Sequence, residues 1–299
     1  MSATVWEVTI AVLLAVLAFD LALAVIRRNK ETSIKEATAW TIFYVSAAIG
    51  FGYSLGVWNT TQSRNEFFAG WITEYSLSID NLFIFILILA RFKIDKTKQQ
   101  LVLLVGIFMA LVLRGIFIAL GSAAISRYTW VFFIFGAFLL YTAFKLINES
   151  GEKEWKEGRL IGWFRKKGAS PLTIVLVAIA VTDLIFALDS IPAIFGLTKD
   201  PYIVFTANAF ALMGLRQLYF LIGGLMSRLI YLTKGLSIIL GFIGVKLIIE
   251  AFHGIGTHIL FGLHIPEISL PFSLTFIIGT LVITTIASLI VSSKSKVAE

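Results

Sequence analysis

Cysteine is absent from this 299-residue chain, which excludes disulfides, thiolate metal sites and thiol redox chemistry. Charge is also scarce, because only 14% of the residues are charged whereas a soluble domain carries about 25%. No nucleotide-binding loop is present, so ATP is not a direct energy source. Apolar residues make up 58% of the chain instead. Because cysteine is absent, any bound metal would have nitrogen or oxygen ligands.

Apolar runs long enough to cross a bilayer recur along almost the whole chain. They predict an all-α, polytopic transmembrane helix bundle that forms a single domain over residues 1–299. We place about nine spans: 5–26, 38–58, 67–90, 99–120, 129–148, 171–195, 203–223, 236–252 and 272–292.

Basic residues follow the predicted topology. The net charge is +7, but most Lys and Arg lie in the connections after spans 1, 3, 5 and 7 and in the C-terminal segment. The alternate connections hold only Arg64, Arg127 and Lys199. This asymmetry predicts an external N-terminus and a cytoplasmic C-terminus. It makes a lipid bilayer, and not a nucleic acid, the partner of the positive charge.

Two short acidic motifs lie inside apolar stretches. Each begins with an acid and ends with an aspartate and a small polar residue. The first motif contains Glu74, Asp80 and Asn81, and the second contains Asp183, Asp189 and Ser190. Ionisable residues at membrane depth are costly and usually mark an ion or proton pathway. Two matching copies therefore predict such a pathway.

The charged positions also indicate an internal repeat. Span 4 carries Arg114 and span 5 carries Lys145, while span 7 carries Arg216 and span 8 carries Lys246 at nearly the same spacing. Spans 3–5 (67–149) and 6–8 (171–252) thus form repeats A and B, joined by a basic cytoplasmic connection at 150–170. Segments 1–58 and 272–292 are accessory. Three spans per copy make the repeat inverted, which is a transporter architecture.

Helix geometry limits how the acids of one motif can act. On an ideal helix they lie about 120° apart and about 9 Å along the axis, so both cannot face one small ion. Either the helix unwinds locally, or one acid from each copy meets the other across the interface. Pro192 favours a helix break in the second motif, because it leaves the Leu188 carbonyl without a helical partner. That carbonyl would then be available to an ion.

The candidate ligands form a hard, oxygen-rich set that suits manganese, calcium or magnesium. Arg114 and Arg216 are candidate counter-charges, which would stand in for the missing cation in an empty site. Fixed structural ion pairs are the alternative for both arginines, and for Lys145 and Lys246 with the acid four positions on. Asp20 in the first span is a further intramembrane acid. The three histidines, His253, His258 and His264, are expected in a solvated external loop.

The two motifs resemble the TerC/Alx family of prokaryotic membrane proteins. Glu74, Leu77, Ser78, Asp80 and Asn81 match the first family pattern. The second pattern runs from Asp183 to Ala193, and the resemblance extends over roughly residues 1–255. It implies a multi-span inner-membrane protein related to the lysine-exporter superfamily, with members linked to manganese efflux. The resemblance also implies that the metal site consists of the motif positions Glu74, Asp80, Asn81, Asp183, Asp189 and Ser190.

We therefore expect a secondary transporter that exports a divalent cation, with manganese favoured, and no enzymatic activity or bound cofactor. Protons are a plausible coupling ion through the same carboxylates. The alternative is a membrane scaffold or assembly factor of the tellurium-resistance type that transports nothing. An intramembrane hydrolase with paired aspartates is a weaker rival, because no nucleophile or zinc motif is present. The oligomeric state stays open.

Overall fold

A computed structural model describes residues 1–26, 33–148, 159–222, 229–260 and 263–295. The described part is almost entirely helical. Its elements are α1 (Ala3–Ile26), α2 (Ile34–Trp58), α3 (Thr61–Arg91), α4 (Lys96–Arg127), α5 (Val131–Asn148), α6 (Arg159–Lys166), α7 (Pro171–Phe195), α8 (Pro201–Ile222), α9 (Leu232–Gly254), β1 (Ile259–Leu260), β2 (Leu263–His264) and α10 (Leu270–Ser295). The strands β1 and β2 pair as a short antiparallel hairpin.

The nine long helices of the described part coincide with the nine predicted spans. Within the described residues, eight helices are long and apolar enough to cross a membrane. The remaining one, α8, has a shorter apolar stretch that covers Pro201–Leu215. The structure therefore confirms the polytopic helical bundle.

Side chains that cap the helices fix several of their beginnings. Ser33, Thr60 and Ser170 each accept a hydrogen bond from a backbone N–H in the first turn of α2, α3 and α7, respectively. Pro171 follows Ser170 in the first turn of α7, where its missing N–H costs nothing.

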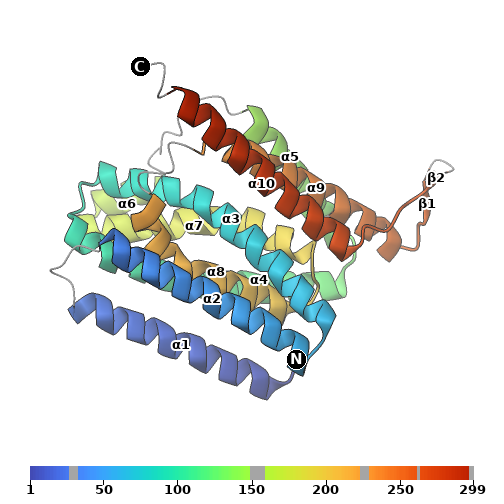
Figure 1. Cartoon of the computed structure of the whole chain (residues 1–299), viewed down its shortest axis with the longest axis horizontal. Coiled ribbons are helices and arrows are strands. Elements are labelled where there is room, and N and C mark those ends of the chain that lie inside the picture. Colours follow the sequence, from blue (N-terminus) through green and yellow to red (C-terminus); the bar gives the residue numbers. More distant parts are fainter. Residues whose placement is uncertain (27–32, 149–158, 223–228, 261–262, 296–299) are drawn as a thin grey trace.

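The helices are arranged around a central group of four, namely α3, α4, α7 and α8. Helix α3 packs against α8, α4 packs against α7, and α5 packs closely against α9, while α1 and α10 lie at the periphery (Figure 1). Exchanging α3, α4 and α5 for α7, α8 and α9 converts the α3–α8 contact into the α7–α4 contact. An internal repeat would give this pattern, and the inverted repeat itself stays a prediction.

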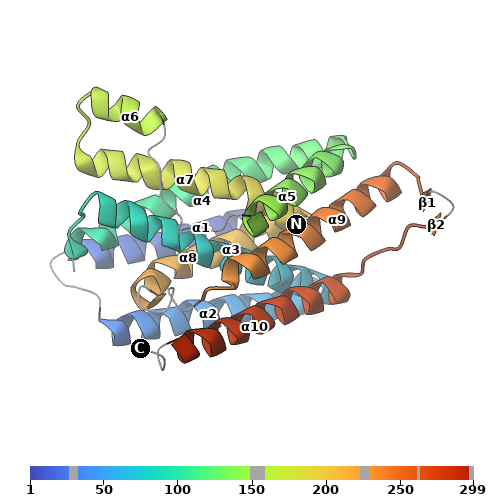
Figure 2. The same cartoon turned by 90° about the horizontal axis from the view of Figure 1, so that it is seen from above.

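The two ends of the bundle carry different features. Helix α6 and the C-terminus lie at one end, whereas the β1–β2 hairpin lies at the opposite end (Figures 1 and 2). Large apolar side chains cover the outside, for example Val57, Phe144 and Ile283. A surface of this kind suits contact with lipid chains.

One prediction about local structure is wrong. The predicted helix break at Leu188 and Pro192 does not occur, because α7 continues to Phe195 with Pro192 inside it. The proline lies in the last turn of the helix, which continues past it, and its missing N–H leaves one carbonyl, that of Leu188, without its usual helical partner. The connection at 150–170 also contains a helix, α6, although residues 149–158 lie outside the described part.

The histidines are also placed differently from the prediction. His253 lies in the last turn of α9 and not in a loop, and the centre of its ring lies 5.2 Å from that of the His258 ring, with the two rings tilted by 36°. His264 lies in β2. Helix α9 continues for two residues beyond the predicted span, to Gly254, and therefore includes His253.

Candidate ion-binding site

Arg114 is the centre of a polar cluster inside the bundle. It lies near the middle of α4 and its side chain is fully buried. A buried guanidinium is stable only when its donors are satisfied by hydrogen bonds to opposite charge. The groups that surround Arg114 therefore define the site.

Asp183 of α7 binds Arg114 through two parallel hydrogen bonds. Arg114 Nε donates to Asp183 Oδ2 at 3.2 Å, and Nη2 donates to Oδ1 at 3.0 Å. This planar fork fixes both groups and is among the stronger side-chain interactions in proteins. Asp183 is itself only 1% exposed.

Glu74 of α3 approaches Arg114 from another helix. Nη1 of Arg114 donates to Glu74 Oε1, which also accepts a hydrogen bond from Ser78 Oγ at 3.0 Å. Ser78 lies four residues after Glu74 and therefore on the same helix face. The second oxygen, Glu74 Oε2, is buried without a hydrogen-bond partner among the described residues. It is an anionic oxygen that can accept a further ligand.

Asn208 and Ser190 complete the surroundings of Arg114. Asn208 of α8 accepts a hydrogen bond from Nη1 through Oδ1 at 2.8 Å, and its Nδ2 donates to the Val204 carbonyl at 2.8 Å. The second bond keeps the amide oxygen turned toward the guanidinium. Ser190 Oγ lies 3.5 Å from Nη1. The cluster thus draws on α3, α4, α7 and α8.

Among the side chains that the structure describes, the cluster contains more negative than positive charge. Glu74 and Asp183 contribute two carboxylates when ionised, while Arg114 contributes one positive charge. All three lie near the middle of their helices, where a membrane offers no water to screen the difference. The site as a whole therefore attracts cations.

Asp189 lies apart from this cluster. It follows Asp183 by six residues and so points in another direction, where its Oδ1 accepts a hydrogen bond of 3.0 Å from Thr142 of α5. Ser190, at the seventh position, shares the face of Asp183 instead. One acid from each motif meets at Arg114, as in the second of the two predicted arrangements.

Four other predicted site residues are not among the described contacts of Arg114. The side chains of Asp80 and Arg216 lie outside the described part of the structure, although both residues belong to helices α3 and α8. Asn81 is 7% exposed in α3, and Asp20 is buried in α1. Their role at the site stays a prediction.

The two lysines are not equivalent in the structure. Lys145 is exposed on α5, and Glu149, its predicted partner, lies outside the described residues. Lys246 is buried in α9, where its Nζ donates to Ser273 Oγ at 3.2 Å. Glu250, the predicted partner of Lys246, instead forms its ion pair with Lys199. The prediction of a direct Lys246–Glu250 pair is therefore wrong, because the connection after α7 supplies a competing ammonium.

The oxygen atoms at the centre suit a hard cation, but not in the present arrangement. Carboxylate, amide and hydroxyl oxygens are typical ligands of magnesium, calcium and manganese. Within the described residues, however, no three acidic or histidine side chains converge on one point. An ion at this site would have to replace Arg114 between Glu74 and Asp183.

Asn208 and Thr142 are the residues that sequence reasoning did not assign to the site. Asn208 is an isolated polar residue at the start of the apolar stretch that ends at Arg216, and this is the one signal that pointed to it. Residues of this kind commonly form interhelical hydrogen bonds. Thr142 lies in an apolar run of α5 with no such signal. Only the packing of α5 against α7 reveals its contact with Asp189.

Comparisons with known proteins agree with the motifs. Residues 59–296 match the model of the "Integral membrane protein TerC family". An uncharacterized membrane protein of Mycobacterium tuberculosis is 39% identical, over 96% of this chain and 79% of its own length. An uncharacterized membrane protein of Myxococcus xanthus is 38% identical, over 83% of this chain and 84% of its own.

A further relative in Escherichia coli carries the printed name "Putative membrane-bound redox modulator Alx". It is 36% identical, over 93% of this chain and 91% of its own length. No solved structure matches the chain. The family match covers most of the sequence and includes both acidic motifs. The chain belongs to the TerC family of integral membrane proteins.

Proposed function

We propose that this protein is a membrane transporter that exports a divalent cation from the cytoplasm, with manganese as the favoured ion. The observation that carries the proposal is the fully buried Arg114 held between Glu74 and Asp183. Burying three charges in a lipid-embedded bundle is costly, and ionisable residues at membrane depth usually mark an ion or proton pathway. The proposal includes an inner-membrane location, an external N-terminus and no enzymatic activity.

In the proposed mechanism Arg114 occupies the place of the cation when the site is empty. An arriving divalent ion competes for the same oxygens of Glu74 and Asp183, and Arg114 withdraws from them. Asn208 and Ser190 supply neutral oxygen ligands from the neighbouring helices. Asp80 and Asp189 belong to the same motifs and are proposed to receive the ion about 9 Å away along the helix axes.

Export needs an energy source, and proton exchange is the proposed one. Two carboxylates that lose a cation can take up protons in its place, because the low dielectric of the site disfavours uncompensated negative charge. Manganese transport in proteoliposomes should therefore move protons in the opposite direction. A pH-sensitive dye inside the vesicles that stays constant during transport would contradict the coupling.

Manganese uptake into vesicles that contain the purified protein tests the ion's identity. We expect accumulation above that of protein-free vesicles, and competition by manganese stronger than by calcium or magnesium. Uptake that calcium or magnesium suppresses more strongly than manganese does would assign another ion to the site.

A scaffold or assembly factor without transport is the alternative function. Such a protein needs no ion site, so Asp80→Asn and Asp189→Asn should leave its activity intact. Cellular metal content and the assembly of membrane complexes, measured together in both variants, separate the two functions. The redox role in the name of the Escherichia coli relative cannot rest on thiols here, because the chain has no cysteine. Metal export would affect redox state indirectly.

A further inference from the structure

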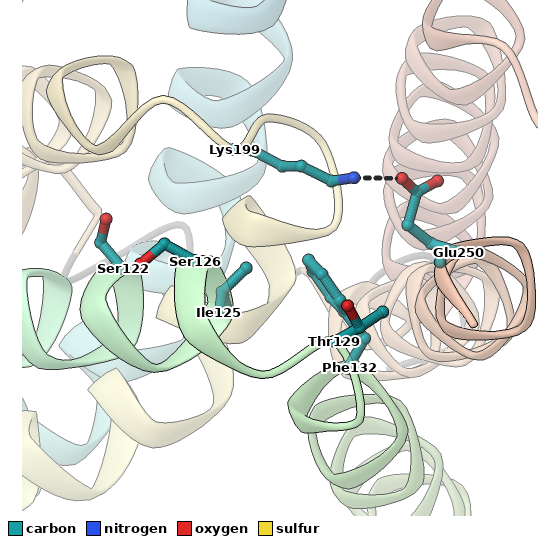
Figure 3. A pocket seen from close by; sticks show the side chains of 8 residues that line it. Ser122, Ile125, Ser126, Thr129, Phe132, Lys199 and Glu250 are labelled. Carbon is teal, nitrogen blue, oxygen red and sulfur yellow. Dashed lines mark hydrogen bonds and ion pairs between the residues drawn. The ribbon is translucent and has the colours of Figure 1, made fainter. Parts of the chain in front are cut away.

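We propose that a cavity at the hairpin end of the bundle is a second cation site, which binds a hydrated divalent ion away from the Arg114 cluster. The cavity has a volume of about 210 Å³. Figure 3 shows it between α4, the beginning of α5, the connection after α7 and the end of α9. We call it the vestibule, and its polar lining consists of Ser122, Ser126, Thr129, Lys199 and Glu250.

The size of the vestibule suits an ion that keeps its water shell. A water molecule occupies about 30 Å³ in the liquid, so the cavity has room for about seven waters. An octahedral divalent ion with six waters fits within that volume. The hydroxyls of Ser122, Ser126 and Thr129 can accept hydrogen bonds from such waters, as the carboxylate of Glu250 can.

Helix ends around the vestibule favour positive charge. Helix α4 ends at Arg127, directly after the lining residue Ser126, and α9 ends at the lining residue Gly254. Helix α7 ends at Phe195, shortly before Lys199. The carbonyl groups at a helix C-terminus carry partial negative charge, and three such ends lie near the vestibule, against the N-termini of α5 and of α8, which begins at Pro201.

A tethered cation already occupies the vestibule. The ammonium of Lys199 forms an ion pair with Glu250 across the cavity and lies 5.3 Å from the centre of the Phe132 ring (Figure 3). An anionic carboxylate and an aromatic face are two groups that attract a cation. The side chain of Lys199 is 60% exposed, so it can move into solvent when another cation arrives. The arrangement parallels Arg114 between its carboxylates.

The vestibule lies beside α3, the helix that carries Glu74 of the Arg114 cluster. Next to Lys199, Thr198 Oγ1 donates to Glu66 Oε2 at 2.6 Å. Glu66 precedes Glu74 on α3 by eight residues, or about 12 Å along the axis. One part of the inference rests on the proposed function, namely that an exported ion binds at the vestibule after it leaves the Arg114 cluster. Binding at the vestibule is testable without any transport.

The absence of cysteine allows a test with a single spin label. We would attach a nitroxide to Ile255→Cys, which follows the lining residue Gly254, and to Lys98→Cys at the other end of the bundle as the control. The full-length protein in nanodiscs is titrated with manganese. Because manganese is paramagnetic, we expect it to broaden the spectrum of the label at 255 in a saturable manner and to leave the label at 98 unchanged.

Two substitutions then assign the binding to the vestibule. Glu250→Gln should abolish the saturable broadening at 255. Lys199→Gln removes the competing ammonium and should lower the manganese midpoint about 2- to 5-fold, as expected for a partly exposed ion pair. A matched change at the other end, Lys98→Gln, removes one partner of the exposed Lys98–Asp95 pair and should leave the midpoint unchanged.

The proposal is overturned if manganese leaves the label at 255 unaffected, or if Glu250→Gln and Lys199→Gln leave the midpoint where it was. Weaker manganese binding in Lys199→Gln would also overturn it, because the lysine would then support the site and not compete with the ion. Glu250→Gln serves alone if Lys199→Gln does not fold. Failed transport together with intact broadening would contradict the proposed function and leave the vestibule standing.

Discussion

At the scale of single residues, the stability of the protein depends on how the three buried charged side chains of the Arg114 cluster compensate one another. The net contribution of a buried ion pair is small, but removing one partner leaves a charge without compensation. Arg114 is the one positive charge described in the cluster, whereas Glu74 and Asp183 share the negative charge. The three residues should therefore respond unequally to substitution.

Arg114→Gln should destabilise the protein more than Glu74→Gln. The first change leaves two buried carboxylates without their partner, for which we expect a loss of about 3–5 kcal/mol in the free energy of unfolding. The second change keeps the fork between Arg114 and Asp183. Thermal unfolding in detergent measures the difference.

Asp95→Asn is the control for both substitutions, since it alters an exposed pair with Lys98 and should change stability by less than about 1 kcal/mol. A stability of Arg114→Gln equal to that of wild type would show that the carboxylates do not depend on the guanidinium.

At the scale of helices, the most extensive contact in the described part of the bundle joins α5 and α9, and two glycines lie within it. A methyl group at Gly136 would lie 2.8 Å from the Gly244 carbonyl oxygen, and one at Gly244 would lie 3.0 Å from that of Gly136. Small residues of this kind let helix backbones approach in membranes, where no hydrophobic effect drives helix association.

Gly136→Val should therefore separate α5 from α9 and lower the unfolding temperature in detergent. The added side chain would meet the backbone of α9, which cannot move aside as a flexible side chain could. Gly50→Val is the matched control, because nothing lies within 4 Å of a methyl group at Gly50 of α2. Equal unfolding temperatures for both variants would contradict the close packing.

The sequence predicted the helices well but the chain connections less well. Length and apolar composition were sufficient for every long helix, because a span needs about 20 apolar residues wherever it packs. They were not sufficient for α6, a short helix with basic residues at both ends, or for the course of α7 through Pro192. A proline near a helix end can be accommodated, and only the surrounding packing determines the result.

The candidate site was predictable in its residue types but not in its grouping. Helix geometry correctly indicated that one unbroken helix cannot direct both Asp183 and Asp189 to the same point. It did not determine whether the helix breaks or one acid from each motif meets the other across the interface. That choice depends on contacts among α3, α4, α7 and α8, which connect residues far apart in the chain.

At the scale of the whole molecule, direction across the membrane determines what the site can do. The distribution of basic residues predicts that the end with α6 and the C-terminus is cytoplasmic and that the hairpin end is external. The structure places these features at opposite ends, as Figure 1 shows. The vestibule would then open to the outside.

Single cysteines test this orientation directly, because the natural chain has none. An impermeant maleimide applied to intact spheroplasts should label Ile255→Cys. Lys98→Cys should react only after the membrane is permeabilised. The reverse pattern would place the N-terminus in the cytoplasm and turn the proposed export into import.

Manganese flux through the purified protein in proteoliposomes tests the central claim most directly. Glu74→Gln and Asp183→Asn should each lower the flux by about 10- to 100-fold, as expected for the loss of a group at a metal site, while Asp95→Asn should transport at the rate of wild type. Wild-type flux no higher than that of empty vesicles, or unchanged flux in Glu74→Gln and Asp183→Asn, would contradict the account.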